Sequence, residues 1–122
     1  MKFVGILKEH ESGLVKIGQA LSDFNAPNKS KIENYEAIVS YLENGTIVIS
    51  FLHYVQDAMG NSIVPLIFYT DGKWIWPSYL VHYLSKNYTS LLPVEFIADM
   101  KYNKFDPQKS RRRENSGGAK VL

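Results

Sequence analysis

Residues 70–77, TDGKWIWP, decide how this 122-residue chain folds. An Asp-Gly pair between two apolar runs is typical of a β-hairpin, because a type I′ turn needs positive φ at both central residues. Gly72 suits that turn, and residues 62–69 and 73–76 are then the paired strands. Alternate residues of a strand share a face, so Trp74 and Trp76 point to the same side. We expect this hairpin to be the scaffold that joins the sheet to the helices.

Three helices are predicted around the hairpin. Pro77 cannot continue a strand but suits the first turn of a helix, so residues 79–88 are predicted to be helical. Ser30 and Glu33 have the spacing of a capping box, and the apolar residues after them recur at helical intervals. Asn44-Gly45 supplies a left-handed stop for that helix. A third, short helix begins near the Leu-Pro pair at residues 92–93.

Two further strands complete the predicted sheet. Lys2–Leu7 is apolar around a single glycine and predicts an opening strand. Thr46–Tyr54 is rich in β-branched and aromatic residues and predicts a central strand. The chain is therefore expected to be an α+β protein, with a mainly antiparallel sheet, a central Asp-Gly hairpin and about three packed helices.

Composition indicates one globular domain with a basic end. Hydrophobic residues make up 45% of the chain and aromatic residues 13%, and there is no cysteine. The formal charge of +2 divides into +4 on Lys109–Leu122 and −2 on the rest. We expect a single domain over residues 1–108 and a flexible basic tail over 109–122. The short apolar start does not match a signal peptide, so we expect a cytosolic protein.

The sequence carries no catalytic signature. His10, His53 and His82 are not at metal-ligand spacing, and there is no phosphate-binding loop or nucleophile elbow. We therefore expect no metal, no cofactor and no enzymatic activity. Two alternatives stay open: a small enzyme of unrecognised type, and a nucleic-acid-binding module. The second would use the basic residues of Lys109–Arg113 and exposed tyrosines.

An acidic surface is the best candidate for partner binding. Glu33, Glu36 and Glu43 fall together on the solvent side of the predicted helix. They form either an ordinary solvated face or a surface that attracts a basic partner. Beyond these three, the further candidates are Asp57, Asp71 and Tyr79. Trp74 and Trp76 are predicted to pack in the core, although large aromatics also serve as interface anchors or stack on ligands.

Several segments together resemble a known kind of protein. They are residues 70–77, Leu80, His82-Tyr83-Leu84, Asn87-Tyr88, the Leu92-Pro93-x-Glu95-Phe96-Ile97 run, the opening Phe3–Leu7 and Tyr41–Gly45. This pattern is similar to that of small bacterial immunity proteins of toxin–immunity pairs, including those of contact-dependent growth inhibition. The resemblance implies a cytosolic protein that binds a cognate toxin domain, often a nuclease. Such a protein neutralises the toxin by covering its active site or substrate surface.

Overall fold

The described residues form a sheet of four strands, with the hairpin strands at its centre. The computed structural model describes residues 2–10, 18, 20–24, 27–56 and 59–110. In these residues the strand order is β1-β4-β3-β2, with β1 parallel to β4 and the other pairs antiparallel. The strands are β1 (Lys2–Phe3), β2 (Thr46–Gln56), β3 (Ser62–Thr70) and β4 (Trp74–Pro77). The predicted α+β class with a mainly antiparallel sheet is confirmed.

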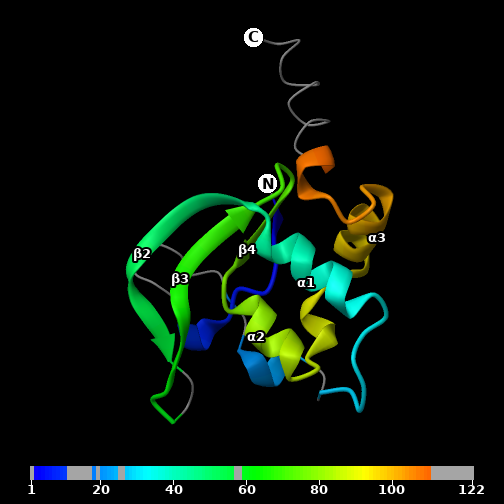
Figure 1. Cartoon of the computed structure of the whole chain (residues 1–122). Helices are drawn as coiled ribbons and strands as arrows, with labels where there is room; N and C mark the ends of the chain where they lie inside the picture. Colours follow the sequence, from blue (N-terminus) through cyan, green and yellow to red (C-terminus); the bar gives the residue numbers. More distant parts are fainter. Residues whose placement is uncertain (1, 11–17, 19, 25–26, 57–58, 111–122) are drawn as a thin grey trace.

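Helices gather beside the sheet, away from its β2 edge (Figure 1). The α-helices are α1 (Tyr35–Glu43), α2 (Leu80–Ser85) and α3 (Val94–Tyr102), and the short 3-10 helices are η1 (Lys8–His10), η2 (Leu21–Asp23) and η3 (Thr89–Leu91). In Figure 1, β2 curves along the outer side of the molecule and α3 lies on the opposite side. The core therefore forms between the central strands and the helices.

The two tryptophans of β4 hold α1 and α3 against the sheet. Trp74 and Trp76 are 4% and 0% exposed, and both rings pack on Phe96 of α3, with centroids 5.1 and 5.5 Å away. The Trp76 indole N–H donates to the Leu42 carbonyl of α1 at 2.9 Å. The Trp74 indole N–H donates to the Asp99 carboxylate at 2.7 Å. Each indole thus satisfies its only donor while burying its ring.

Asp99 of α3 also pairs with the hairpin loop. Its carboxylate lies 2.9 Å from the Lys73 ammonium. Burial acts to raise the pKa of Asp99, but the hydrogen bonds from Trp74 and Lys73 and the lysine charge outweigh it, so the pKa is lowered. A lowered pKa means that folding favours the ionised carboxylate. This interaction therefore stabilises the fold above the ordinary carboxyl pKa and is lost as acid protonates Asp99.

The Asp71 carboxylate organises the loop between β3 and β4. Its Oδ1 accepts the backbone N–H groups of Lys73 at 2.9 Å and Trp74 at 2.8 Å. Gly72 has a φ of 100°, whereas Asp71 is not among the described residues with positive φ. Because a type I′ turn needs positive φ at both positions, the predicted turn type is wrong. The connection is a three-residue loop closed by an aspartate side chain.

Tyr41 of α1 completes the binding of this carboxylate. Its hydroxyl donates to Oδ2 of Asp71, and both side chains are almost fully buried. Burial raises the pKa of Tyr41 above its usual range, and Asp71 raises it further, while hydrogen bonds with Ser110 and Asn103 act in the opposite direction. Tyr41 therefore keeps its proton and remains a donor. A buried carboxylate is tolerable here because three donors surround it.

The predicted start of the first helix is wrong. Instead of a cap at Ser30, α1 begins at Tyr35, after Asn34 in the left-handed region with φ of 61°. The Lys31 ammonium donates to the Ser85 carbonyl at the end of α2, and the Asn28 N–H donates to the Asn87 carbonyl at 3.0 Å. These long-range contacts hold the segment before α1 against the end of α2. Helical spacing in the sequence alone therefore could not predict where α1 begins.

Two local predictions at the other helix ends are also corrected. Pro77 does not open a helix but ends β4 opposite Phe68, and Ser78 extends the pairing through its N–H to the Ile67 carbonyl at 2.7 Å. Gly45 is not a left-handed stop, since it is not among the positive-φ glycines. A Cβ at Gly45 would lie 2.6 Å from the Trp76 ring, so the glycine is needed for space.

The second strand and the chain end differ from expectation as well. Among the described strands, β2 lies at the edge and is not the predicted central strand, because β1 pairs with β4 on the other side of the hairpin. The packed chain also extends past the expected boundary at residue 108. Residues 107–110 are helical, and Ser110 is only 6% exposed. The rest of the predicted flexible tail, residues 111–122, lies outside the described residues.

We predict that Tyr41→Phe lowers the free energy of unfolding by about 2 kcal/mol, because the buried Asp71 carboxylate loses a charge-assisted donor. Urea unfolding of the full chain measures this. The control is Tyr54→Phe, at a tyrosine 59% exposed on β2, which should change stability by less than about 0.5 kcal/mol. Equal effects of the two substitutions would show that the Tyr41–Asp71 contact does not matter.

Candidate partner-binding surface

The β2 edge is uncharged and exposes large apolar side chains. Its eleven residues, TIVISFLHYVQ, include no Asp, Glu, Lys or Arg. Ile47, Val48 and Tyr54 are 57%, 51% and 59% exposed. Edge strands of stable monomers usually carry charges or proline that discourage pairing with other chains. The irregular register with β3 also discourages pairing, but this edge carries neither a charge nor a proline. It has the chemistry of a surface that another protein covers.

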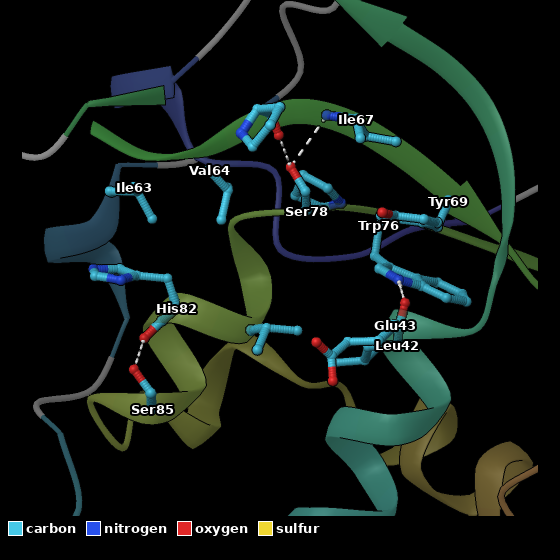
Figure 2. A pocket seen from close by; sticks show the side chains of 13 residues that line it. Leu42, Glu43, Ile63, Val64, Ile67, Tyr69, Trp76, Ser78, His82 and Ser85 are labelled. Atoms are coloured by element: carbon cyan, nitrogen blue, oxygen red, sulfur yellow. Dashed lines mark hydrogen bonds between the residues drawn. The ribbon is translucent and has the colours of Figure 1, made fainter. Parts of the chain in front are cut away.

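A groove of about 350 Å³ lies between β3, the end of α1 and α2. Figure 2 shows its side chains converging from the sheet above and the two helices below. Most are apolar, and their apolar atoms provide most of the lining surface. The lining residues are Leu42, Glu43, Ile63, Val64, Pro65, Ile67, Tyr69, Trp76, Pro77, Ser78, Val81, His82 and Ser85. We call this set the β3–α2 groove.

Three of the polar side chains in the groove already have partners. The Ser78 hydroxyl accepts the Ile67 N–H at 3.1 Å and donates to the Pro65 carbonyl at 2.6 Å. The Ser85 hydroxyl donates to the His82 carbonyl, as Figure 2 also shows. The Trp76 N–H is bound to α1. By contrast, the Glu43 carboxylate forms no hydrogen bond or ion pair with any residue that the structure describes.

The groove and the β2 edge form one continuous face. Ile47 of β2 lies opposite Tyr69 of β3, and Tyr54 lies opposite Pro65. Residues directly opposite each other in an antiparallel pair share a face of the sheet. Since Tyr69 and Pro65 line the groove, Ile47 and Tyr54 extend the same apolar face toward the edge. A partner could therefore contact the groove and the edge together.

The three glutamates that the sequence predicts to bind a partner are all exposed, but they lie at different places in the structure. Glu33 lies in the turn before α1, so it does not share the helix face that the spacing predicted. Glu36 and Glu43 lie seven residues apart on α1, two turns along the same side and roughly 10 Å apart. Only Glu43 lines the groove. The structure thus separates one predicted partner-binding residue from the other two.

Two other predicted partner-binding residues are internal. Asp71 is 1% exposed, and its carboxylate is occupied by the hairpin loop and Tyr41. Tyr79 is also 1% exposed, with its hydroxyl accepting the Leu7 N–H at 2.9 Å and its ring 4.7 Å from that of His10. Neither can anchor a partner in this fold, so both assignments are corrected. Asp57 lies outside the described residues.

The sequence does not predict that the apolar side chains on this face are exposed. Ile47, Val48 and Tyr54 were assigned to a central strand, where apolar residues need no functional explanation. One signal could have found them: between Thr46 and Thr70 the sequence holds a single charged residue, Asp57. A run of that length with one charged residue is compatible with two buried strands or with a surface that binds another protein. Only the strand order distinguishes the two.

Two other kinds of site are absent from the described residues. No group of three or more His, Asp or Glu side chains there could hold a metal ion. None of the helices in the described ranges has the length and apolar character that crossing a membrane requires. The β3–α2 groove is a concave surface with one unpaired charge, and it has the shape of a binding surface.

No protein-family model matches the chain, and no curated protein or solved structure matches it either. The surface itself and the resemblance in the sequence are therefore the guides to function.

We predict that the same substitution costs little stability at one end of β2 and much more at the other. Val48→Thr should change the free energy of unfolding by less than about 0.5 kcal/mol, because Val48 faces solvent. Val55→Thr should cost about 1–3 kcal/mol, because Val55 is 4% exposed and the hydroxyl would be buried. Urea unfolding compares the two variants. A large loss in Val48→Thr would mean that the edge is packed within the chain.

Proposed function

We propose that this chain is an immunity protein that binds a cognate toxin domain and blocks its active site or substrate surface. The observation that carries the proposal is the uncharged β2 edge with its exposed Ile47, Val48 and Tyr54. The resemblance to immunity proteins supports the same function and points to the bacterial cytosol. A nuclease domain is the partner that the resemblance favours.

Inhibition by occlusion needs a surface and no reaction. A stable complex buries roughly 800 Å² on each partner, with a few large side chains at its centre. The β2 edge supplies apolar and aromatic side chains of this kind, and the adjoining groove supplies a concavity for the partner's own anchor. The two features are continuous through the Ile47–Tyr69 and Tyr54–Pro65 pairs. Together they provide the apolar centre of a contact, with the acidic residues of α1 beside it.

Acidic residues beside this surface suit a basic partner. Glu36 and Glu43 lie on the exposed side of α1, and Glu43 reaches the groove. A nuclease presents positive charge to its nucleic-acid substrate. Opposite charges at the rim of an interface increase the association rate and help to select the partner. Binding here would place this acidic edge over the toxin's substrate-binding surface.

The resemblance implies a toxin encoded beside this chain, so the proposal is tested with the product of the neighbouring gene. We expect the full chain to co-purify with that product and to protect cells that express it. A double variant, Ile47→Lys with Val48→Lys, should weaken binding about tenfold or more, because two charges would enter the apolar contact. Val94→Lys, at an exposed valine on α3, is the matched control and should keep full affinity.

Two results would contradict the proposal. One is full protection by the Ile47/Val48 double variant, with affinity equal to that of Val94→Lys. The other is salt-sensitive binding to RNA or DNA by the full chain without binding to the neighbouring product, which would favour a nucleic-acid-binding module.

A further inference from the structure

We infer that the β3–α2 groove receives an apolar side chain of a protein partner, flanked by a lysine or arginine that pairs with Glu43. This inference rests on the proposed function, and it specifies the chemistry of the partner segment that enters the groove.

The size and lining of the groove fit one large apolar side chain. Its volume of about 350 Å³ is at the lower end of the roughly 300–1,000 Å³ of ligand-binding sites. Ile67 and Tyr69 from β3 and Val81 from α2 line opposite sides of it. These three side chains are partly exposed, so the apolar lining is accessible. An aromatic side chain, which buries about 150–250 Å², is an anchor of suitable size.

The negative charge of Glu43 favours a partner that carries a basic residue beside its apolar anchor. Among the described residues that line the groove, Glu43 is the only Asp, Glu, Lys or Arg, and it has no partner in the described part of the chain. Figure 2 shows its carboxylate extending from the end of α1 toward α2. Glu36 lies two turns back on the same side of α1. A basic residue next to the apolar anchor would meet an unpaired carboxylate, whereas an acidic residue would be repelled.

The serines contribute little to selection. Because the hydroxyls of Ser78 and Ser85 are already hydrogen-bonded within the chain, they do not require a polar group of a ligand as a partner. Selectivity therefore comes from apolar fit and from one negative charge. This combination describes a short basic-aromatic segment of a protein surface, which is the kind of surface a nuclease substrate site presents.

Two blocked peptides test the inference on the full chain. Acetyl-Leu-Trp-Lys-amide and acetyl-Leu-Trp-Glu-amide differ only in charge, and each is titrated into ¹⁵N-labelled protein. We expect the lysine peptide to shift the amide signals of Ile67 and Val81 and to bind about three- to fivefold tighter, the size of one exposed ion pair. Glu43→Gln should remove this preference. Glu36→Gln, the matched control outside the groove, should retain most of it.

A second pair of variants tests the apolar part. Val81→Arg should fill the groove and reduce binding of the lysine peptide about tenfold or more, with folding verified by thermal unfolding. Val94→Arg, on the exposed side of α3, should leave binding unchanged. Equal binding of the two peptides, shifts confined to other residues, or a preference that survives Glu43→Gln would overturn the inference.

The outcome is separable from that of the proposed function. If the neighbouring product binds wild type and Val81→Arg equally, the immunity function stands and the groove inference is wrong. If the lysine peptide binds the groove but the neighbouring product does not bind, the groove inference stands and the assigned partner is wrong. A third outcome is that the chain self-associates and that Tyr102→Ala abolishes this self-association. The groove would then hold the exposed Lys101-Tyr102 pair of a second copy of this chain, which would also overturn the inference.

Discussion

The buried carboxylate of Asp71 is the constraint on which the rest of this structure depends. It closes the hairpin loop through the backbone N–H groups of Lys73 and Trp74, and it accepts the hydroxyl of Tyr41 from α1. One side chain thus fixes both the turn and the position of a helix against it. With the loop closed, Trp74 and Trp76 project together toward Phe96, and α3 is held against the same face.

This arrangement determines which surface remains for binding. Since β1 pairs with β4 and the helices pack around the tryptophans, β2 is left at the outer edge of the sheet. The edge carries no charged side chain, and its apolar face runs into the β3–α2 groove. The stretch that decides the fold is therefore scaffold. The proposed binding surface lies mainly on β2 and β3, with Glu43 at its acidic rim, and of that stretch Trp76 and Pro77 line the groove.

The sequence predicted what depends on local chemistry. The alternation of Trp74 and Trp76, the existence of three helices and the α+β class all follow from spacing and turn residues. It could not predict what depends on distant contacts. The parallel pairing of Lys2 with Trp74 joins residues far apart in the chain, and without it β2 looks like a central strand. The burial of Tyr79 likewise depends on Leu7, and the start of α1 depends on the contact between Lys31 and Ser85.

Hydrogen–deuterium exchange of the full chain, with and without the neighbouring gene product, tests the location of the binding surface most directly. Backbone amides that a partner covers or pairs exchange more slowly. We expect slower exchange in Thr46–Gln56, Ser62–Thr70 and Leu80–Ser85, with little change in Val94–Tyr102. Slower exchange confined to α3, with β2 and the groove unchanged, would contradict the assignment of the uncharged edge as the surface that binds the partner.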